Sequence, residues 1–230
     1  MKFYLFIFLF FTKILIGNDV FIFSPPNNWK ITDPSKLLTT VKAGFVGKSK
    51  SFIFKPSINL AIDDIDISFE DYILEAKKLH LEDKNNSYLE IDKIKIDDQN
   101  IHISQITTKT HIGNIYKIQA ILVKNNKVYI LTGATLKQDF TKINKEILNS
   151  IKTTHFVKNL EDDILDKTLK EKFITDYQNL KTIYQDKEKF NKKEFSKSLK
   201  LFQNFIANNL KHLGKYWQFL ALEKSNNDFN

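Results

Sequence analysis

The chain has 230 residues, 42% hydrophobic and 27% charged, which is enough for one medium domain with an appendage or for two small domains. All 35 basic residues are lysine and the formal net charge is +8. The excess is compatible with contact to an anionic membrane surface. Arginine, the residue that reads phosphate and guanine in bidentate fashion, is absent, so we expect no nucleic-acid partner. The absence of cysteine excludes disulfides, thiolate nucleophiles and a lipid-modified cysteine.

The N-terminus has the pattern of a signal peptide over residues 1–17. Lys2 precedes an apolar run of signal-peptide length, and Gly17 is a small residue suited to the position before a cleavage site. An uncleaved membrane anchor is the alternative, but spanning requires roughly 20 apolar residues and Lys13 interrupts the run. We therefore expect an exported protein, periplasmic or secreted, that begins near Asn18.

A short strand is predicted at 20–23, where the sequence reads VFIF. It ends at Pro25 and Pro26, which have no N–H group for a sheet ladder. Trp29 follows a turn formed by two asparagines. We expect Trp29 to be a buried plug at one end of a sheet rather than a residue that stacks on a ligand.

Two further strands are predicted at 51–54 and 57–62, separated by Lys55 and Pro56. The second strand alternates apolar and other residues, the pattern of a half-buried strand. A helix follows from Ser68 to about Leu79, because Ser68 can cap its start, acidic residues occupy the first turn and apolar residues form one side.

From residue 88 the chain returns to strands. Four alternating segments, at 88–97, 100–110, 115–123 and 127–135, predict an antiparallel meander. Asn125 and Asn126 form a two-residue hairpin loop suited to positive φ. A helix at about 140–151 follows. This order predicts an α+β fold in which helices cover one face of an antiparallel sheet.

Several motifs, in their order and spacing, resemble those of the PsbP-like superfamily, which includes bacterial DcrB-like and mycobacterial LpqN-like exported proteins. They are an opening strand followed by Pro and Trp, a P-x-I-N strand, a Ser-led helix, and a closing hairpin with its helix. The matching residues are Phe23, Pro26 and Trp29; Pro56, Ser57, Ile58 and Asn59; Ser68, Tyr72 and Ile73; Val123, Lys127, Val128, Tyr129, Leu131 and Thr132; and Ile147, Leu148, Ser150 and Ile151.

The resemblance covers about residues 20–156 and implies a PsbP-like sandwich domain over 18–156. It also implies an extracytoplasmic setting and a role that is usually non-catalytic, as an assembly factor, adaptor or binding module. A shared fold does not choose a ligand.

After residue 156 the composition changes, and 157–230 reads as an added helical hairpin with an end that is a candidate for disorder. Apolar residues recur at helical spacing over 165–184, and again over 195–220 after a break in which Asn191 can cap. The apolar stripe can pack on itself, on the sheet or on a partner. The candidate partner surface comprises Lys211, Lys215, Tyr216, Trp217 and Phe219.

No catalytic constellation is evident. The five histidines form no H-x-x-x-H or H-E-x-x-H pattern, and we expect His102 to face solvent because it alternates with two isoleucines. Neither Ser104 nor Ser150 lies in a G-x-S-x-G context. We expect no metal, no cofactor and no enzyme, but an exported binding or assembly module of the cell envelope. The alternative is a small-ligand carrier or a hydrolase with a pocket between sheet and helix.

Overall fold

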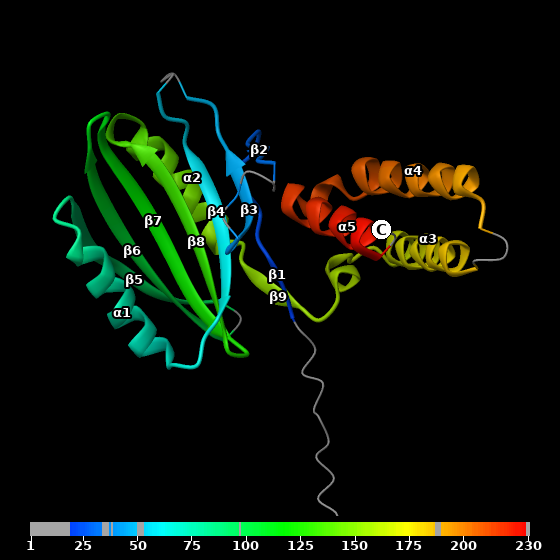
Figure 1. Cartoon of the computed structure of the whole chain (residues 1–230), viewed down its shortest axis with the longest axis horizontal. Coiled ribbons are helices and arrows are strands. Elements are labelled where there is room, and N and C mark those ends of the chain that lie inside the picture. Colours follow the sequence, from blue (N-terminus) through cyan, green and yellow to red (C-terminus); the bar gives the residue numbers. More distant parts are fainter. Residues whose placement is uncertain are drawn as a thin grey trace, which may run out of the picture.

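A computed structural model of the chain describes residues 19–33, 37, 39–49, 53–96, 98–186 and 190–228. The predicted signal peptide, 1–17, lies outside the described residues, as do Ser51 and Phe52 of the strand predicted at 51–54. The described chain forms a sheet module and a helical module that extends away from it (Figure 1). None of the described helices has the length and apolarity needed to cross a membrane.

Seven antiparallel strands form the sheet, in the order β2-β3-β4-β8-β7-β6-β5. The long meander β5 to β8 was predicted and is confirmed. The strands are β2 (Lys30–Ile31), β3 (Val41–Val46), β4 (Ser57–Asp64), β5 (Asn86–Ile96), β6 (Gln99–Thr110), β7 (Gly113–Lys124) and β8 (Lys127–Leu136).

Local signals in the sequence place the turn and the helix start. Asn125 and Asn126 both take positive φ, at 52° and 58°, and join β7 to β8 as expected. Ser68 caps α1 (Phe69–Glu82), where its side chain accepts a hydrogen bond from the backbone N–H of Asp71.

The first part of the chain differs from the prediction. Val41–Val46, which was not predicted, forms strand β3, whereas Ile53 and Phe54 are not in a strand. The first strand, β1 (Val20–Ile22), does not join the main sheet. It pairs antiparallel with β9 (His155–Val157) in a separate two-stranded ribbon.

The two helices of the sheet module lie on opposite faces, so the expectation that helices cover one face is wrong. α2 (Phe140–Lys152) packs Ile143 and Ile147 on the face that presents Ile118 and Ala120. The α1 helix packs on the opposite face, where Ile121, the neighbour of Ala120, points the other way. Successive strand residues point to opposite faces, so a sheet buried on both sides needs apolar residues of both parities.

The helical module contains three main helices rather than the two predicted: α3 (Lys167–Gln185), α4 (Lys192–Asn209) and α5 (Lys215–Asp228). A 3-10 turn at Lys211–Leu213 separates α4 from α5, and Gly214 takes a φ of 91° there. Only glycine adopts this conformation without strain, so the single glycine within the apolar repeat ends the second predicted helix.

Besides the small cluster under α1, two larger hydrophobic clusters fill the modules, and they meet at the ribbon strand β1. Phe21 and Phe23 belong to the cluster of the sheet module, whereas Ile22 between them belongs to the helical cluster. Trp29 is 4% exposed, so its predicted burial is confirmed. A Cβ at Gly47 would lie 2.8 Å from Cε2 of Trp29, so glycine is what allows the indole to pack against this strand end.

Candidate functional site on the α1 face of the sheet

The α1 face of the sheet carries a polar cluster that sequence reasoning missed. His102 and Ser104 in β6 are 1% and 0% exposed, and Gln119 in β7 is the cross-strand neighbour of Ser104. His102 was expected to face solvent, and that expectation is wrong. The alternation with Ile101 and Ile103 is real, but α1 covers the face to which His102 points.

Three rings stack through this cluster. The ring centroids of His80 and Tyr88 are 6.1 Å apart, and those of Tyr88 and His102 are 6.5 Å apart. The Tyr88 hydroxyl and His102 Nε2 lie 2.8 Å apart and share a hydrogen bond. The helix α1 contributes His80, while β5 and β6 contribute the other two rings. The stack therefore joins the end of α1 to the edge of the sheet.

Burial keeps the cluster uncharged. It lowers the pKa of His80 and of His102, and it raises the pKa of the Tyr88 hydroxyl. At neutral pH both imidazoles are therefore neutral and the phenol is protonated. The three rings therefore offer uncharged donors and acceptors, while the carboxylate of Glu90 lies beside them and pairs with Lys77 at 2.9 Å.

Several polar atoms of the cluster remain unsatisfied. His102 Nδ1, the Ser104 hydroxyl and Gln119 Oε1 are buried and make no aligned hydrogen bond with any described residue. Ser104 lies near Tyr88, and Gln119 lies near His80, but neither pair has hydrogen-bond geometry. Each such group costs about 1–3 kcal/mol when it lacks a partner, so a water or a ligand group is expected beside them.

Two open grooves flank α1. One, of about 410 Å³, lies against β5 and β6 and is lined by Phe69, Ile73, Lys93 and Ile101 among others. The other, of about 510 Å³, lies on the β7 and β8 side. Its lining includes Tyr72, Ala76, Leu79, Gln119, Ile121 and Ile130. We call this second depression the α1 groove.

The two aromatic residues at the centre of the predicted partner surface are buried, whereas its two lysines are exposed. Tyr216 is 2% exposed and Trp217 is fully buried. Tyr216 enters the cluster of the sheet module, with its ring centroid 4.7 Å from that of Phe23. Lys215 Nζ donates to the backbone oxygen of Trp29 at 2.7 Å. Plain packing between the modules, the alternative interpretation, accounts for these residues.

The other two residues of that surface differ from each other, because Phe219 packs against the same cluster as Tyr216 and Lys211 does not. Phe219 is half-buried, and its ring centroid is 6.4 Å from that of Tyr216. Lys211 is exposed in the 3-10 turn before Gly214. The five residues therefore do not form one accessible patch.

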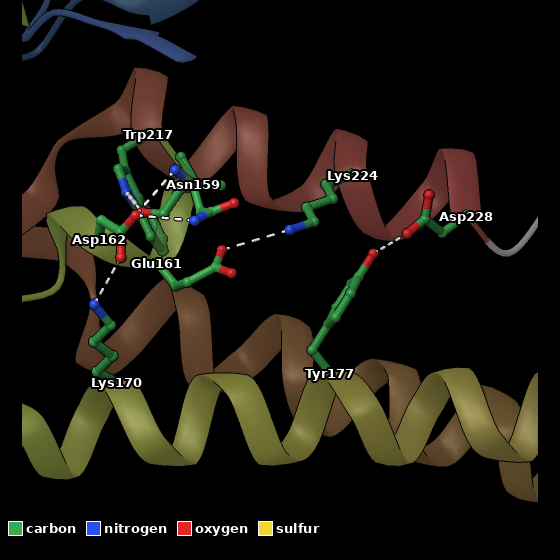
Figure 2. Close-up of polar contacts among 9 residues, drawn as sticks. Asn159, Glu161, Asp162, Lys170, Tyr177, Trp217, Lys224 and Asp228 are labelled. Carbon is green, nitrogen blue, oxygen red and sulfur yellow. Dashed lines mark hydrogen bonds and ion pairs between the residues drawn. The ribbon is translucent and has the colours of Figure 1, made fainter. Parts of the chain in front are cut away.

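Polar contacts fix α5 inside the helical module rather than forming a reactive site (Figure 2). Trp217 Nε1 donates to the backbone oxygen of Leu160 at 3.1 Å. Lys170 pairs with Asp162 at 2.9 Å and lowers the pKa of that carboxyl. At the far end of α5, the Tyr177 hydroxyl donates to Asp228. These contacts join α3 and the turn at 160–163 to α5.

The described residues contain no candidate metal-binding site. Over those residues, no group of three or more His, Cys, Asp or Glu side chains is placed to hold a metal ion. His155 is paired with Asp163, with 2.9 Å between Nε2 and Oδ1, at the junction of β9 with the helical module. The carboxylate of Asp163 therefore links His155 of β9 to the helical module.

No protein-family model and no curated protein matches the chain. Solved structures do. LpqN of Mycobacterium tuberculosis, described as involved in cell envelope biogenesis, matches with a TM-score of 0.50 and 10% identity over 62% of this chain and 86% of LpqN. Cyanobacterial PsbP from Synechocystis matches with a TM-score of 0.43 and 12% identity, over 60% of this chain and 86% of that one.

A protein of unknown function from Pseudomonas aeruginosa matches with a TM-score of 0.42 and 13% identity, over 54% of this chain and 94% of that one. LpqN shares the antiparallel sheet and its covering helices with this chain over the matched region. The predicted α+β fold class is confirmed, and the chain has an LpqN-like fold.

Proposed function

We propose that the protein is an exported, non-enzymatic binding or assembly module of the bacterial cell envelope. One observation carries the proposal: the two faces of the sheet are covered unequally. The α2 face packs against a continuous cluster that includes Phe23 of the β1 segment and Tyr216 of α5. On the opposite face α1 contacts β5 and β7, and the residues of β4 and central β8 there stay half-exposed. An uncovered sheet face beside a helix suits contact with another molecule.

Two further observations support a binding role. The sequence begins with a leader typical of export, and LpqN, which shares the fold, is described as involved in cell envelope biogenesis. The polar cluster beneath α1 holds its ionisable side chains neutral, and the Ser104 hydroxyl within it is fully buried. A buried hydroxyl that a substrate cannot reach is a poor nucleophile, which disfavours a hydrolase.

Export and binding can be tested on protein purified from its own envelope. We expect an intact mass corresponding to a start near Asn18, and release in soluble form. Retention of residues 1–17 together with membrane fractionation would refute cleavage and favour the anchored alternative. For binding, cross-linked capture should recover specific envelope proteins that an unrelated exported bait does not recover. Recovery of the same set with both baits would refute the binding role.

A small-ligand carrier is the second candidate, and the unsatisfied atoms of His102, Ser104 and Gln119 favour it. A carrier should retain a small molecule through gentle purification. Native mass spectrometry would then show a discrete added mass that Gln119→Leu removes, because this substitution deletes the amide in the groove. If the parent and the Gln119→Leu variant both show only the mass of the protein itself, no ligand is bound. Ordered water would then be the partner of these atoms, and the carrier function would be refuted.

A further inference from the structure

The uncovered part of the α1 face lies over β4 and β8, the two strands at the middle of the sheet. Cross-strand pairing places Asn59 beside Thr132 and Ala61 beside Ile130 on this face, and all four side chains are half-exposed. In Figure 1 α1 lies on the β5 side of the sheet, away from β3 and β4. The α1 groove is the boundary between this open floor and the helix.

The wall of the α1 groove is apolar and accessible. Leu79 of α1 lines the groove and is 68% exposed, while Tyr72 and Ala76 stand beside it on the same helix. Ile121 and Ile130 line it from the sheet. Most proteins carry isolated leucines on their surface. Leu79 differs from these because other apolar side chains lie next to it in the groove, so that together they form a continuous apolar surface.

The rim of this groove is acidic although the chain as a whole carries a net charge of +8. Glu75 and Glu82 line the groove and form no ion pair with any described residue. Asp71 lies one turn before Glu75 on the same side of α1 and is also exposed. Lys78 is the single cation in the lining. Lys117 of β7 also acts on His80 from the same face, and Asp63 of β4 acts on Tyr72. The four acidic side chains in and around the groove, Asp63, Asp71, Glu75 and Glu82, outnumber the two lysines, Lys78 and Lys117, whereas the molecule as a whole is basic.

The fold restricts what can occupy the groove. β4 is paired on both sides, with β3 and β8, and β8 is paired with β4 and β7. Neither strand has a free edge, so an extended peptide cannot add to them as a further strand. The element that covers an open sheet face next to one helix is a second helix, which presents an apolar stripe to the floor.

We propose that the α1 groove and the open floor of β4 and β8 form the docking site for a basic amphipathic helix of a partner protein. The inference rests on the proposed binding role and adds the site and the partner chemistry. The apolar stripe of the partner helix would pack on Leu79 and Ile130, above the buried Ile121, and its flanking lysines or arginines would meet Glu75 and Glu82. The Gln119 amide would meet a polar side chain of the same helix.

The probe is a synthetic 15-residue peptide of leucine and lysine arranged with helical period, titrated into the full chain by calorimetry. We expect saturable one-to-one binding that weakens as salt rises, since screening acts on exposed charge pairs. The same peptide with glutamate in place of lysine should not bind. The double variant Glu75→Lys with Glu82→Lys should weaken binding at least tenfold, and so should Leu79→Asn, which removes the apolar contact without a change of charge at a site exposed enough to tolerate it.

A matched control separates this site from general charge attraction. Glu171→Lys with Glu194→Lys alters the net charge by the same amount on exposed positions of α3 and α4. This variant should bind the lysine peptide as the parent does. Equal weakening by both double variants, or binding unaffected by Glu75→Lys with Glu82→Lys, would overturn the docking site.

Capture from the envelope distinguishes failure of the site from failure of the proposed function. If the parent chain captures specific partners and the Glu75→Lys, Glu82→Lys chain captures the same ones, the docking site is wrong while the binding role stands. If the parent captures none, the binding role itself fails. Loss of the specific partners with the groove variant alone, together with retention by the α3 and α4 control, is the result expected.

Discussion

Truncation of Tyr216 tests whether α5 holds the two modules together. The Tyr216 side chain is 2% exposed, and its ring centroid lies 4.7 Å from that of Phe23 and 6.4 Å from that of Phe45. The ring therefore comes from the helical module but is buried in the core of the sheet module. Tyr216→Ala removes it and leaves a cavity at the joint.

The size of the effect follows from the buried area. A buried aromatic side chain removes about 150–250 Å² from water, and at about 25 cal/mol per Å² this gives roughly 4–6 kcal/mol. Part of that is offset because the hydroxyl is also taken from water. Measured truncations of large core aromatics cost about 3–5 kcal/mol, and we expect Tyr216→Ala to fall in this range. Tyr216→Phe keeps the ring and should stay within about 1 kcal/mol of the parent.

Urea unfolding followed by tryptophan fluorescence is the assay, because each module contains one tryptophan. Trp29→Phe leaves Trp217 as the reporter of the helical module, and Trp217→Phe leaves Trp29 as the reporter of the sheet module. We expect one shared transition in the parent background and two separated transitions after Tyr216→Ala. Phe190→Ala, at the far end of the helical module where the ring is 39% exposed, is the matched aromatic control. A loss below 1 kcal/mol for Tyr216→Ala would refute the joint.

Trp29→Ala should cost about 3–5 kcal/mol in urea unfolding, as for other large core truncations, and an unchanged midpoint would contradict its role as a plug. Gly133→Ala places a Cβ 2.4 Å from Cδ1 of Ile147, so we expect a loss of about 1–3 kcal/mol that Ile147→Val partly restores; additive losses would be evidence against this contact. Burial raises the pKa of Glu223 above 4.5, so its contribution to the free energy of unfolding is full below that pH and is lost as pH rises through the raised value. Glu223→Gln should abolish this loss in a pH series of melts, and parallel curves for the two chains would contradict it. Residues 18–156 alone should unfold less cooperatively than the full chain, because they lack the α5 side chain that completes their core; a truncated chain as stable as the parent would show instead that these residues form an independent domain.

The sequence predicted the elements whose patterns are local. The meander follows from alternating residues, the β7–β8 turn from Asn125 and Asn126, and the start of α1 from Ser68 and its acidic first turn. The burial of Trp29 followed from its position after two prolines. Each of these depends on neighbouring residues along the chain, so no knowledge of the tertiary contacts was needed.

The errors share one cause, which is cover by distant segments. His102 alternates with isoleucines, a pattern that normally indicates that one face of the strand is exposed to solvent. Here α1 covers that face, so His102 is buried as well. Tyr216 and Trp217 look like an aromatic surface in the sequence, whereas each inserts into a different cluster. Gly214 was the available signal for the break before α5, although the apolar repeat continues through it. Nothing local indicated the acidic groove, because α1 and β7 are far apart in the sequence.

The shared strand β1 has a consequence for the order in which the molecule can be completed. Its side chains serve both modules, with Phe21 in one cluster and Ile22 in the other, and among the described residues it pairs with β9, more than a hundred residues later. The ring that closes over Phe23 comes from Tyr216, later still. During synthesis, residues 21–23 are made early, but the segments that cover them are made much later, the last of them close to the end of the chain. Their three apolar side chains therefore remain exposed until then. Such long-range closure is slow, and the waiting strand is the segment that a chaperone would be expected to hold.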